Sequence, residues 1–318
     1  MDTVELTLKL TPRDRLDLID VHERLLDKHG DLLEPYAKAL YCSYHTTAGY
    51  LEQGLCSRLG HSRESLEAYM SSFRTLFPPD ADYEHDKLHL RTELSEEQRE
   101  NEPLNADSHL TFIGSGLENC VTYDNQPDTP VYFIDLDGVY QETTRERKTT
   151  VVGYNREKLV GQETLAVPMS SHRVDSVNLM DERLGFSDRL RELCERYEIA
   201  KGRIDVSLQP DESSAALTVN EYETLLMQHD LAEVLRNPIR FMARKGKNML
   251  RDPRAVRSKA KNYAKYDLVR FTNRVIDALG MNESLVERVI DKFIAAGASR
   301  RLRMKRSVSL MVNNTDER

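Results

Sequence analysis

Histidines beside acidic residues are the side chains of this sequence best suited to chemistry. His85 lies in the acidic segment Asp-Tyr-Glu-His-Asp, and His109 closes the segment Asp-Ser-His. Upstream, His45 comes directly after an apolar run and before a turn of small residues. Such strand ends commonly expose side chains that bind or react. These three histidines are therefore the first candidates for a functional site.

The three histidines lie on separate segments, and together they could bind one metal ion. A neutral imidazole is the commonest metal ligand in proteins, and a histidine set favours Zn²⁺ or Fe²⁺ over Mg²⁺. Carboxylates from Glu84, Asp86 and Asp107 could add oxygen ligands or orient the imidazoles. The alternative at each position is an ordinary surface or hydrogen-bonded histidine.

The strands that must position these residues follow from apolar alternation and short apolar runs. Residues 4–10 alternate strictly between apolar and polar side chains, which predicts a half-buried strand. Further strands are predicted at 39–44, 119–123, 131–136 and 148–154. With two helices among them, the first 155 residues predict an α+β class without the regular alternation of a doubly wound sheet.

Two helices are predicted between these strands. The first should begin at Thr11-Pro12 and end at Gly30, and the second should span residues 62–77. The polar stretch 80–105 is predicted to be a long loop of the kind that carries function. The segment Gly-Ser-Gly at 114–116 lacks the context of a phosphate-binding loop, so it predicts a bend between strands.

Residues 156–318 are predicted to form a second, mostly helical and basic accessory domain. Helices are expected at 183–196, 218–235, 254–279 and 282–296, with one short strand at 204–208. Residues 236–306 contain 20 Lys and Arg against 6 Asp and Glu, although the whole chain has a net charge of -8. Such a basic face attracts phosphates or nucleic acid, unless it docks on the acidic part of the chain or its oligomer.

The composition also excludes several classes of protein. No stretch approaches the ~20 apolar residues that a membrane span requires, and the first ten residues lack the layout of a signal peptide. The four cysteines occur at no Cys-x-x-Cys spacing, which argues against a zinc ribbon and a disulfide framework. We therefore expect a cytoplasmic protein without membrane contact.

Three motifs in the same order resemble those of the YjbQ family, which is described as secondary thiamine-phosphate synthases. Tyr-His-Thr-Thr-Ala at 44–48 is similar to the family's His-Thr-Ser-Ala strand end. Pro-Asp-Ala-Asp-Tyr-Glu-His-Asp at 79–86 is similar to its Pro-Asp-x-x-x-Tyr-Glu-His-Asp loop. Ser-His-Leu at 108–110, followed by a glycine and a strand, resembles the third motif. The resemblance covers about residues 1–155, and the chain lacks the tryptophan of the family's Gly-Thr-Trp-Gln segment.

The resemblance implies a YjbQ-like α+β fold for residues 1–155 and self-association, as a trimer. It implies one polar pocket in which His45, His85 and His109 bind a divalent metal and, together with Asp86, catalyse the reaction. Thr46 and Thr47 of the first motif are expected to contact the cofactor. The implied substrate is a small phosphorylated or heterocyclic molecule.

Two functions of different classes remain open. The first is a metal-assisted enzyme: a thiamine-phosphate synthase-like transferase would use Mg²⁺ on its leaving diphosphate, whereas Zn²⁺ would also permit hydrolase or lyase chemistry. The second is a nucleic-acid- or phosphate-binding protein that uses the basic face of residues 156–318 and retains only a vestigial pocket. Steep salt dependence of binding to RNA or DNA would favour the second.

Overall fold

The computed structural model describes the greater part of the chain: residues 3–79, 81–91, 94–140, 143–168, 175–212, 215–218, 226–227, 230, 234 and 307–313. At its centre lies a sheet of four antiparallel strands. Their order is β1 (Val4–Leu10), β9 (Arg147–Tyr154), β3 (Lys38–Ser43) and β5 (Cys120–Asp124). The alternation predicted for residues 4–10 is confirmed, because Leu6, Leu8 and Leu10 are buried and β1 pairs with β9 along its whole length.

A second sheet positions the segment that leads into the functional site. It contains β2 (Asp17–Asp20), β6 (Tyr132–Asp135) and β4 (Ala48–Gly49), in the order β2-β6-β4. A short hairpin of β7 (Val139–Tyr140) and β8 (Thr143–Thr144) follows β6. Beyond the last residue of β6, the Leu136 amide donates to the Thr47 carbonyl, so the two segments continue side by side.

Four of the described helices enclose the main core on one face of the central sheet: α1 (Val21–His29), α2 (Gln53–Arg58), α3 (Arg63–Leu76) and α5 (Ala106–Ser115). The segment between α3 and α5 contains η1 (Leu88–Leu90) and α4 (Glu96–Asn101). Val21 and Leu25 of α1, and Leu66 and Met70 of α3, join one apolar cluster with Leu6 of the central sheet. The helix predicted at 62–77 is thereby confirmed. No helix among the described residues has the length and apolar character needed to span a membrane.

Three local predictions for the first half are wrong. The first helix begins at Val21, not at Thr11-Pro12, because residues 17–20 pair with β6 as strand β2; it does end at Gly30. The stretch 80–105 is not one long loop, since it contains η1 and α4. Residues 114–115 belong to α5, which ends at Gly116 with a φ of 76°. The bend predicted there between strands is therefore a helix terminus, and the positive φ explains the glycine.

The described part of residues 156–318 is not mostly helical, which corrects the prediction for this region. It contains strands β10 (Asp175–Asn178), β11 (Lys201–Ser207), β12 (Ala215–Thr218) and β13 (Ser307–Asn313). Beside them lie α6 (Phe186–Arg196), a 3-10 turn η2 (Glu182–Leu184), and helical residues at 226–227, 230 and 234. The helices predicted at 254–279 and 282–296 lie outside the described residues, and the boundary near 155 stays a prediction.

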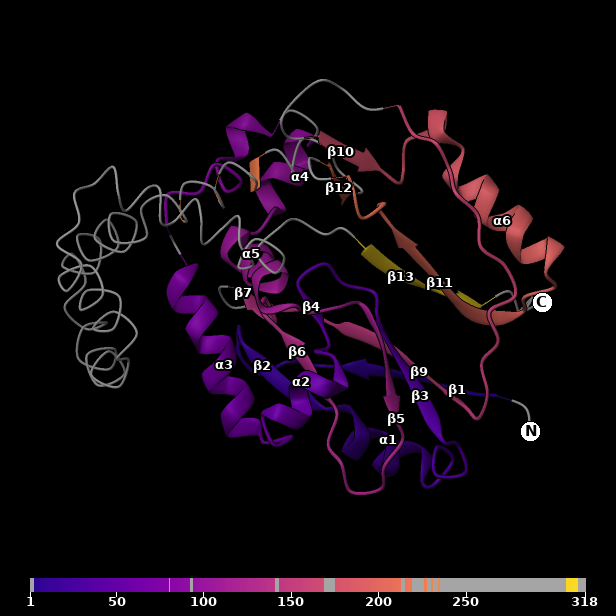
Figure 1. Ribbon diagram of the computed structural model, residues 1–318. Helices are drawn as coiled ribbons and strands as arrows, with labels where there is room; N and C mark the ends of the chain where they lie inside the picture. Colours follow the sequence, from indigo (N-terminus) through magenta and orange to yellow (C-terminus); the bar gives the residue numbers. More distant parts are fainter. Residues whose placement is uncertain are drawn as a thin grey trace, which may run out of the picture.

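A two-stranded antiparallel ribbon of β11 and β13 covers the other face of the central sheet, opposite α1 (Figure 1). Met311 of β13 packs against a small apolar cluster of Leu40, Cys42 and Val152. An ion pair between Lys201 and Glu5 joins the ribbon to the first strand. The central sheet is thus covered on both faces, by helices on one and by strands on the other.

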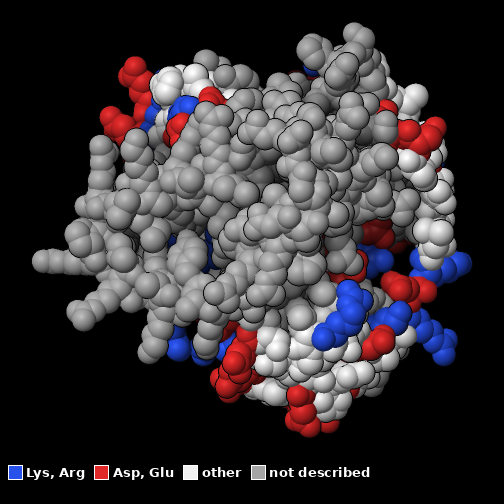
Figure 2. Space-filling model, turned by 60° about the vertical axis from the view of Figure 1, so that its left-hand side comes forward, with Lys and Arg blue, Asp and Glu red and all other residues white. Residues whose placement is uncertain are grey.

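The basic segment predicted at 236–306 lies outside the described residues, so its basic face stays a prediction. Where the face in Figure 2 shows described residues, Lys and Arg lie next to Asp and Glu. The described surface also contains exposed ion pairs, such as Lys9–Glu146 with 2.9 Å between Nζ and Oε1.

Candidate active site

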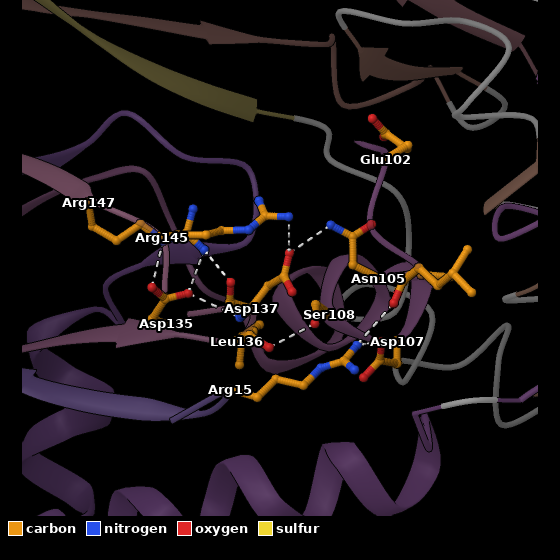
Figure 3. Close-up of polar contacts among 12 residues, drawn as sticks. Arg15, Glu102, Asn105, Asp107, Ser108, Asp135, Leu136, Asp137, Arg145 and Arg147 are labelled. Atoms are coloured by element: carbon orange, nitrogen blue, oxygen red, sulfur yellow. Dashed lines mark hydrogen bonds and ion pairs between the residues drawn. The ribbon is translucent and has the colours of Figure 1, made fainter. Parts of the chain in front are cut away.

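Two buried aspartates lie at the end of β6, and arginines neutralise both. Asp135 accepts two hydrogen bonds from Arg147, at 2.6 Å from Nε and 2.8 Å from Nη2. Both side chains of this pair are nearly inaccessible to solvent. Asp137 Oδ2 lies 3.0 Å from Arg145 Nη2 and accepts a hydrogen bond of 2.9 Å from Asn105 Nδ2 (Figure 3). The strand end thereby fixes two carboxylates and two guanidinium groups in one place.

The first turn of α5 is attached to this strand end. Ser108 Oγ donates to the Leu136 carbonyl at 2.8 Å, and Arg15 Nη2 donates to Asp107 Oδ1 at 2.7 Å (Figure 3). Burial raises the pKa of Asp107 to about 6, and Asp86 and Asp137 act in the same direction against Arg15. Asp107 is consequently a carboxyl group that changes its charge near neutral pH.

His85 is buried and held by three acidic or basic partners. Its Nδ1 lies 3.0 Å from Asp86 Oδ1, and its Nε2 lies 3.5 Å from Arg91 Nη1. A carboxylate accepts a hydrogen bond and a guanidinium donates one. The neutral form of the ring therefore carries its proton on Nδ1, which faces Asp86, and accepts at Nε2, which faces Arg91. The backbone amide of His85 donates to Asp230 Oδ2 at 3.0 Å. The ring is therefore fixed in both position and tautomer.

His109 lies against His85, which brings together two of the three predicted histidines. Their ring centroids are 5.2 Å apart, with the planes inclined by 54°. The common anchor is Asp86, whose Oδ1 also accepts a hydrogen bond from the amide of Ala106, the first residue of α5. His109 stands one helical turn further along, and it is partly exposed whereas His85 is buried. Of the two histidines, His109 is therefore the more accessible to solvent.

The structure places His45 in a different environment. Its Nε2 accepts a hydrogen bond of 2.8 Å from the Lys148 amide, and its ring packs edge-on against Phe133. Burial lowers the pKa of His45 to about 4, assisted by the positive charges of Arg147 and Arg145. His45 is therefore neutral at pH 7, with the proton of its ring on Nδ1.

The part of the chain that the structure describes does not present three ligands to a metal. Among the described residues, no group of three or more His, Cys, Asp or Glu side chains is placed to hold a metal ion. Thr46 is exposed, and Thr47 is buried with its carbonyl bonded to Leu136. The three-histidine metal centre and the cofactor contacts of both threonines thus remain predictions.

Several charged residues of the site were not among the predicted ones. They are Arg15, Arg91, Asp135, Asp137, Arg145, Arg147 and Asp230. A signal for four of them is present in the sequence, since Asp-x-Asp-Gly ends an apolar strand and Arg-x-Arg opens the next one. Nothing local to the sequence marks Asp230, because its carboxylate joins a loop almost 150 residues away.

The arrangement can transfer protons beside positive charge. His109 and Asp107 occupy the first turns of α5, where the partial positive charge of a helix N-terminus also favours anions. Within the described part of the chain, Asp137 Oδ1 and Asn105 Oδ1 are buried without a hydrogen-bond partner. These two oxygens could accept hydrogen bonds from a ligand.

No family model and no curated protein matches this chain. Solved structures do show similarity, at low sequence identity and over about half of the chain. A YbjQ-like protein of unknown function from Sulfolobus solfataricus is 15% identical, with a TM-score of 0.33, and the match covers 49% of this chain and 99% of that one.

Two further solved structures are similar to the same extent. A hypothetical protein from Aeropyrum pernix is 16% identical over 49% of this chain and 100% of its own, with a TM-score of 0.32. An uncharacterized conserved protein of the yjbq/upf0047 family from Clostridium acetobutylicum is 18% identical over 46% and 97%, with a TM-score of 0.30. Two of these three neighbours are described as YbjQ-like or as members of the yjbq/upf0047 family, and none of the three descriptions names an activity.

Proposed function

We propose that this chain is an enzyme that acts on a small phosphorylated substrate by proton transfer, with His109 as the acid–base residue. The observation that carries the proposal is the contact between His109 and the buried His85–Asp86 pair. Acid–base catalysis requires an accessible group that can exchange a proton, and neighbouring side chains that fix the orientation of this group. His109 is the accessible group, and the His85–Asp86 pair fixes its orientation.

His85 and Asp86 act as positioning residues in this proposal. Nδ1 of His85 is directed at Asp86 and Nε2 at Arg91, so neither nitrogen points freely at a substrate. The ring instead supports His109, while Asp86 fixes the first turn of α5 through the Ala106 amide. Loss of Asp86 would therefore disturb the position of both imidazoles at once.

Two partly exposed guanidinium groups near the N-terminus of α5 support an anionic substrate. Arg145 is partly exposed and lies 3.0 Å from the buried Asp137, and Arg15 is also partly exposed where it meets Asp107. Guanidinium groups bind phosphate oxygens through pairs of hydrogen bonds. A phosphoryl group near the N-terminus of α5 would add the favourable interaction with the helix dipole.

The decisive experiment compares His109→Gln with His89→Gln, an exposed histidine of η1, in assays with small phosphorylated compounds. The coupling of a pyrimidine diphosphate to a thiazole phosphate is the first reaction to assay. We expect kcat to fall at least ~100-fold in His109→Gln, the lower range for a lost acid–base group, and to stay unchanged in His89→Gln. Equal turnover of both variants would contradict the proposal.

The roles of the neighbours have their own readouts. Asp86→Asn should lower kcat and displace its pH profile, whereas a purely structural role would change neither the profile nor its midpoint. Arg145→Gln should raise KM for the phosphorylated substrate more than it lowers kcat, because the guanidinium acts on binding.

The divalent metal is a separate proposal, in which His45, His85 and His109 would hold Zn²⁺ or Fe²⁺. It requires His45 and His85 to exchange hydrogen-bond partners of this structure for the metal. Mg²⁺ would act instead if diphosphate is the leaving group. Metal analysis of the purified chain and of the triple His→Ala variant tests it. Metal that the wild type retains and the variant lacks would support the proposal. A wild type without metal after supplementation would contradict it.

A further inference from the structure

Cys42 and Cys120 form a close pair of thiols on neighbouring strands of the central sheet. Cys42 of β3 lies directly opposite Cys120 of β5 in the antiparallel register, and their Sγ atoms are 3.1 Å apart. Both cysteines are free thiols in this structure. Cys42 is buried, whereas Cys120 is partly accessible.

The register of the two strands is favourable for a bond between these sulfurs. The Ser43 amide donates to the Asn119 carbonyl, so 43 and 119 form a hydrogen-bonded pair. The adjacent pair, Cys42 and Cys120, is then a non-hydrogen-bonded one, in which the Cα atoms are only ~4.5 Å apart and the side chains are closest. This separation lies within the range that a disulfide requires, at ~4.4–6.8 Å.

The surroundings favour a thiolate on Cys120 rather than on Cys42. The Cys42 thiol, the Met311 amide of β13 and the guanidinium of Arg203 on β11 lower the pKa of Cys120, against burial and the Asp205 carboxylate. The same contact and burial raise the pKa of Cys42. Arg203 is held beside the pair by a hydrogen bond of 2.8 Å to Thr122. The thiolate is the nucleophilic form of cysteine, so Cys120 is the sulfur that reacts first.

We propose that Cys42 and Cys120 form an oxidation site. A hydroperoxide accepts two electrons from the two thiols, which become a cross-strand disulfide. The Cys120 thiolate attacks one peroxide oxygen and breaks the O–O bond, which gives a sulfenic acid and releases hydroxide. The Cys42 sulfur then attacks the sulfenic sulfur, the S–S bond forms, and the S–O bond breaks with release of water. In total, two thiols and one hydrogen peroxide give one disulfide and two waters.

The other two cysteines provide an internal comparison. Cys56 is buried with its Sγ 3.2 Å from the Tyr123 hydroxyl, and burial raises the pKa of its thiol. Cys194 is buried on α6. Among the described residues, neither Cys56 nor Cys194 has both a second thiol in contact and a cation nearby. Both should therefore react slowly with peroxide.

The test treats the purified full-length chain with hydrogen peroxide, quenches it with catalase, alkylates the remaining thiols and maps the peptides. Cleavage after Lys38, Glu52 and Arg58 places Cys42 and Cys56 in different peptides, so a link to Cys120 can be assigned. We expect a Cys42–Cys120 disulfide that dithiothreitol reverses, forming at least ~10-fold faster than Cys56 or Cys194 loses its thiol.

Two variants determine the order of the steps. In Cys42→Ala, Cys120 should accumulate as a sulfenic acid that dimedone traps, because the resolving thiol is missing. In Cys120→Ala, Cys42 should keep its thiol, and Cys194→Ala should form the disulfide as the wild type does. The peptide map of the oxidised wild type tests the proposal even if a variant fails to fold. The proposal would be overturned if Cys42 and Cys120 lose their thiols no faster than Cys56. It would also be overturned if the disulfide forms only between chains.

Discussion

Asp107 is a carboxyl group of the site whose pKa is raised by its burial. Burial raises its pKa to about 6, above the ordinary value of 3.8 for an aspartate, and the Arg15 guanidinium only partly opposes this. As pH rises, the unfolded chain therefore loses this proton before the folded chain does. The stabilising effect of the protonated group is complete below pH ~4 and is lost as pH rises through 6.

The variant Asp107→Asn should remove this part of the pH dependence. A shift of about two pKa units corresponds to about 2–3 kcal/mol, so the wild type should lose that much stability relative to the variant between pH 4 and 6.5. Urea unfolding at several pH values measures the difference. Asp124→Asn, exposed at the end of β5, is the control for the removal of a surface carboxylate. A difference in stability between the wild type and Asp107→Asn that does not change with pH would contradict the prediction.

The Arg147–Asp135 pair belongs to the same scale but has a structural role. Both side chains are nearly inaccessible to solvent, and Arg147 also donates to the Asp137 carbonyl at 2.8 Å. Replacing one partner of a buried ion pair leaves the other charge without compensation, which typically costs about 3–5 kcal/mol. An exposed pair contributes only about 0–1 kcal/mol, because water screens it.

We accordingly expect Arg147→Met to lower the free energy of unfolding by about 3–5 kcal/mol. Lys9→Met is the matched control, because Lys9 and Glu146 form an ion pair with both side chains well exposed. Its loss should cost less than about 1 kcal/mol. Denaturant unfolding of both variants decides the matter, and equal losses would show that the Arg147–Asp135 pair is not a structural element.

At the scale of elements, the sequence predicted the central strands and helix α3 well, but it misplaced the start of α1 and missed α5. Strict alternation in residues 4–10 needs no knowledge of the partner strand, and it identified β1 correctly. By contrast, Leu18, Val21 and Leu25 fit one helical face, yet residues 17–20 extend to pair with β6 more than a hundred positions away. Pairing over such a distance is not encoded in the local pattern.

Helix α5 explains why only part of the site could be predicted. Most of its side chains are buried, so it lacks the polar face that marks an amphipathic helix in a sequence. His85 and His109 could be named as candidates from their acidic neighbours. Their contact depends on the packing of α5 against the loop at 83–86, and its anchor Asp230 lies far along the chain.

The start of α1 gives a direct test of this element's boundary. Asp20 caps the helix by accepting a hydrogen bond of 3.2 Å from the Glu23 amide. Asp20→Ala should therefore cost about 1 kcal/mol of stability, the usual value for a lost cap. Thr11→Ala, at the exposed position where the sequence pattern placed the cap, should change stability by no more than about 0.5 kcal/mol. The reverse order of the two effects would contradict this assignment.

At the scale of the whole molecule, the ribbon of β11 and β13 joins the second half of the chain to the first. It covers Leu40, Cys42 and Val152 on the sheet face opposite the helices, and Arg203 bonds across to Thr122. A second apolar cluster contains Phe77, Leu110, Ala216 and Val234, so residues from both halves also pack beside α5. Stability of the central sheet should consequently depend on residues near the end of the chain.

The variant Met311→Asp tests this dependence, because it places a charge against the apolar cluster formed by Leu40, Cys42 and Val152. Lost apolar contact and a partly buried charge together should cost about 2 kcal/mol or more. Hydrogen exchange should accelerate in β3 and β5 as well as in β13, since the ribbon shields that face of the sheet. Ser307→Asp introduces the same charge at the exposed first residue of β13 and is the control, with little change expected. If Met311→Asp accelerates exchange only within β11 and β13, the sheet does not depend on the ribbon, and the two halves are stable independently.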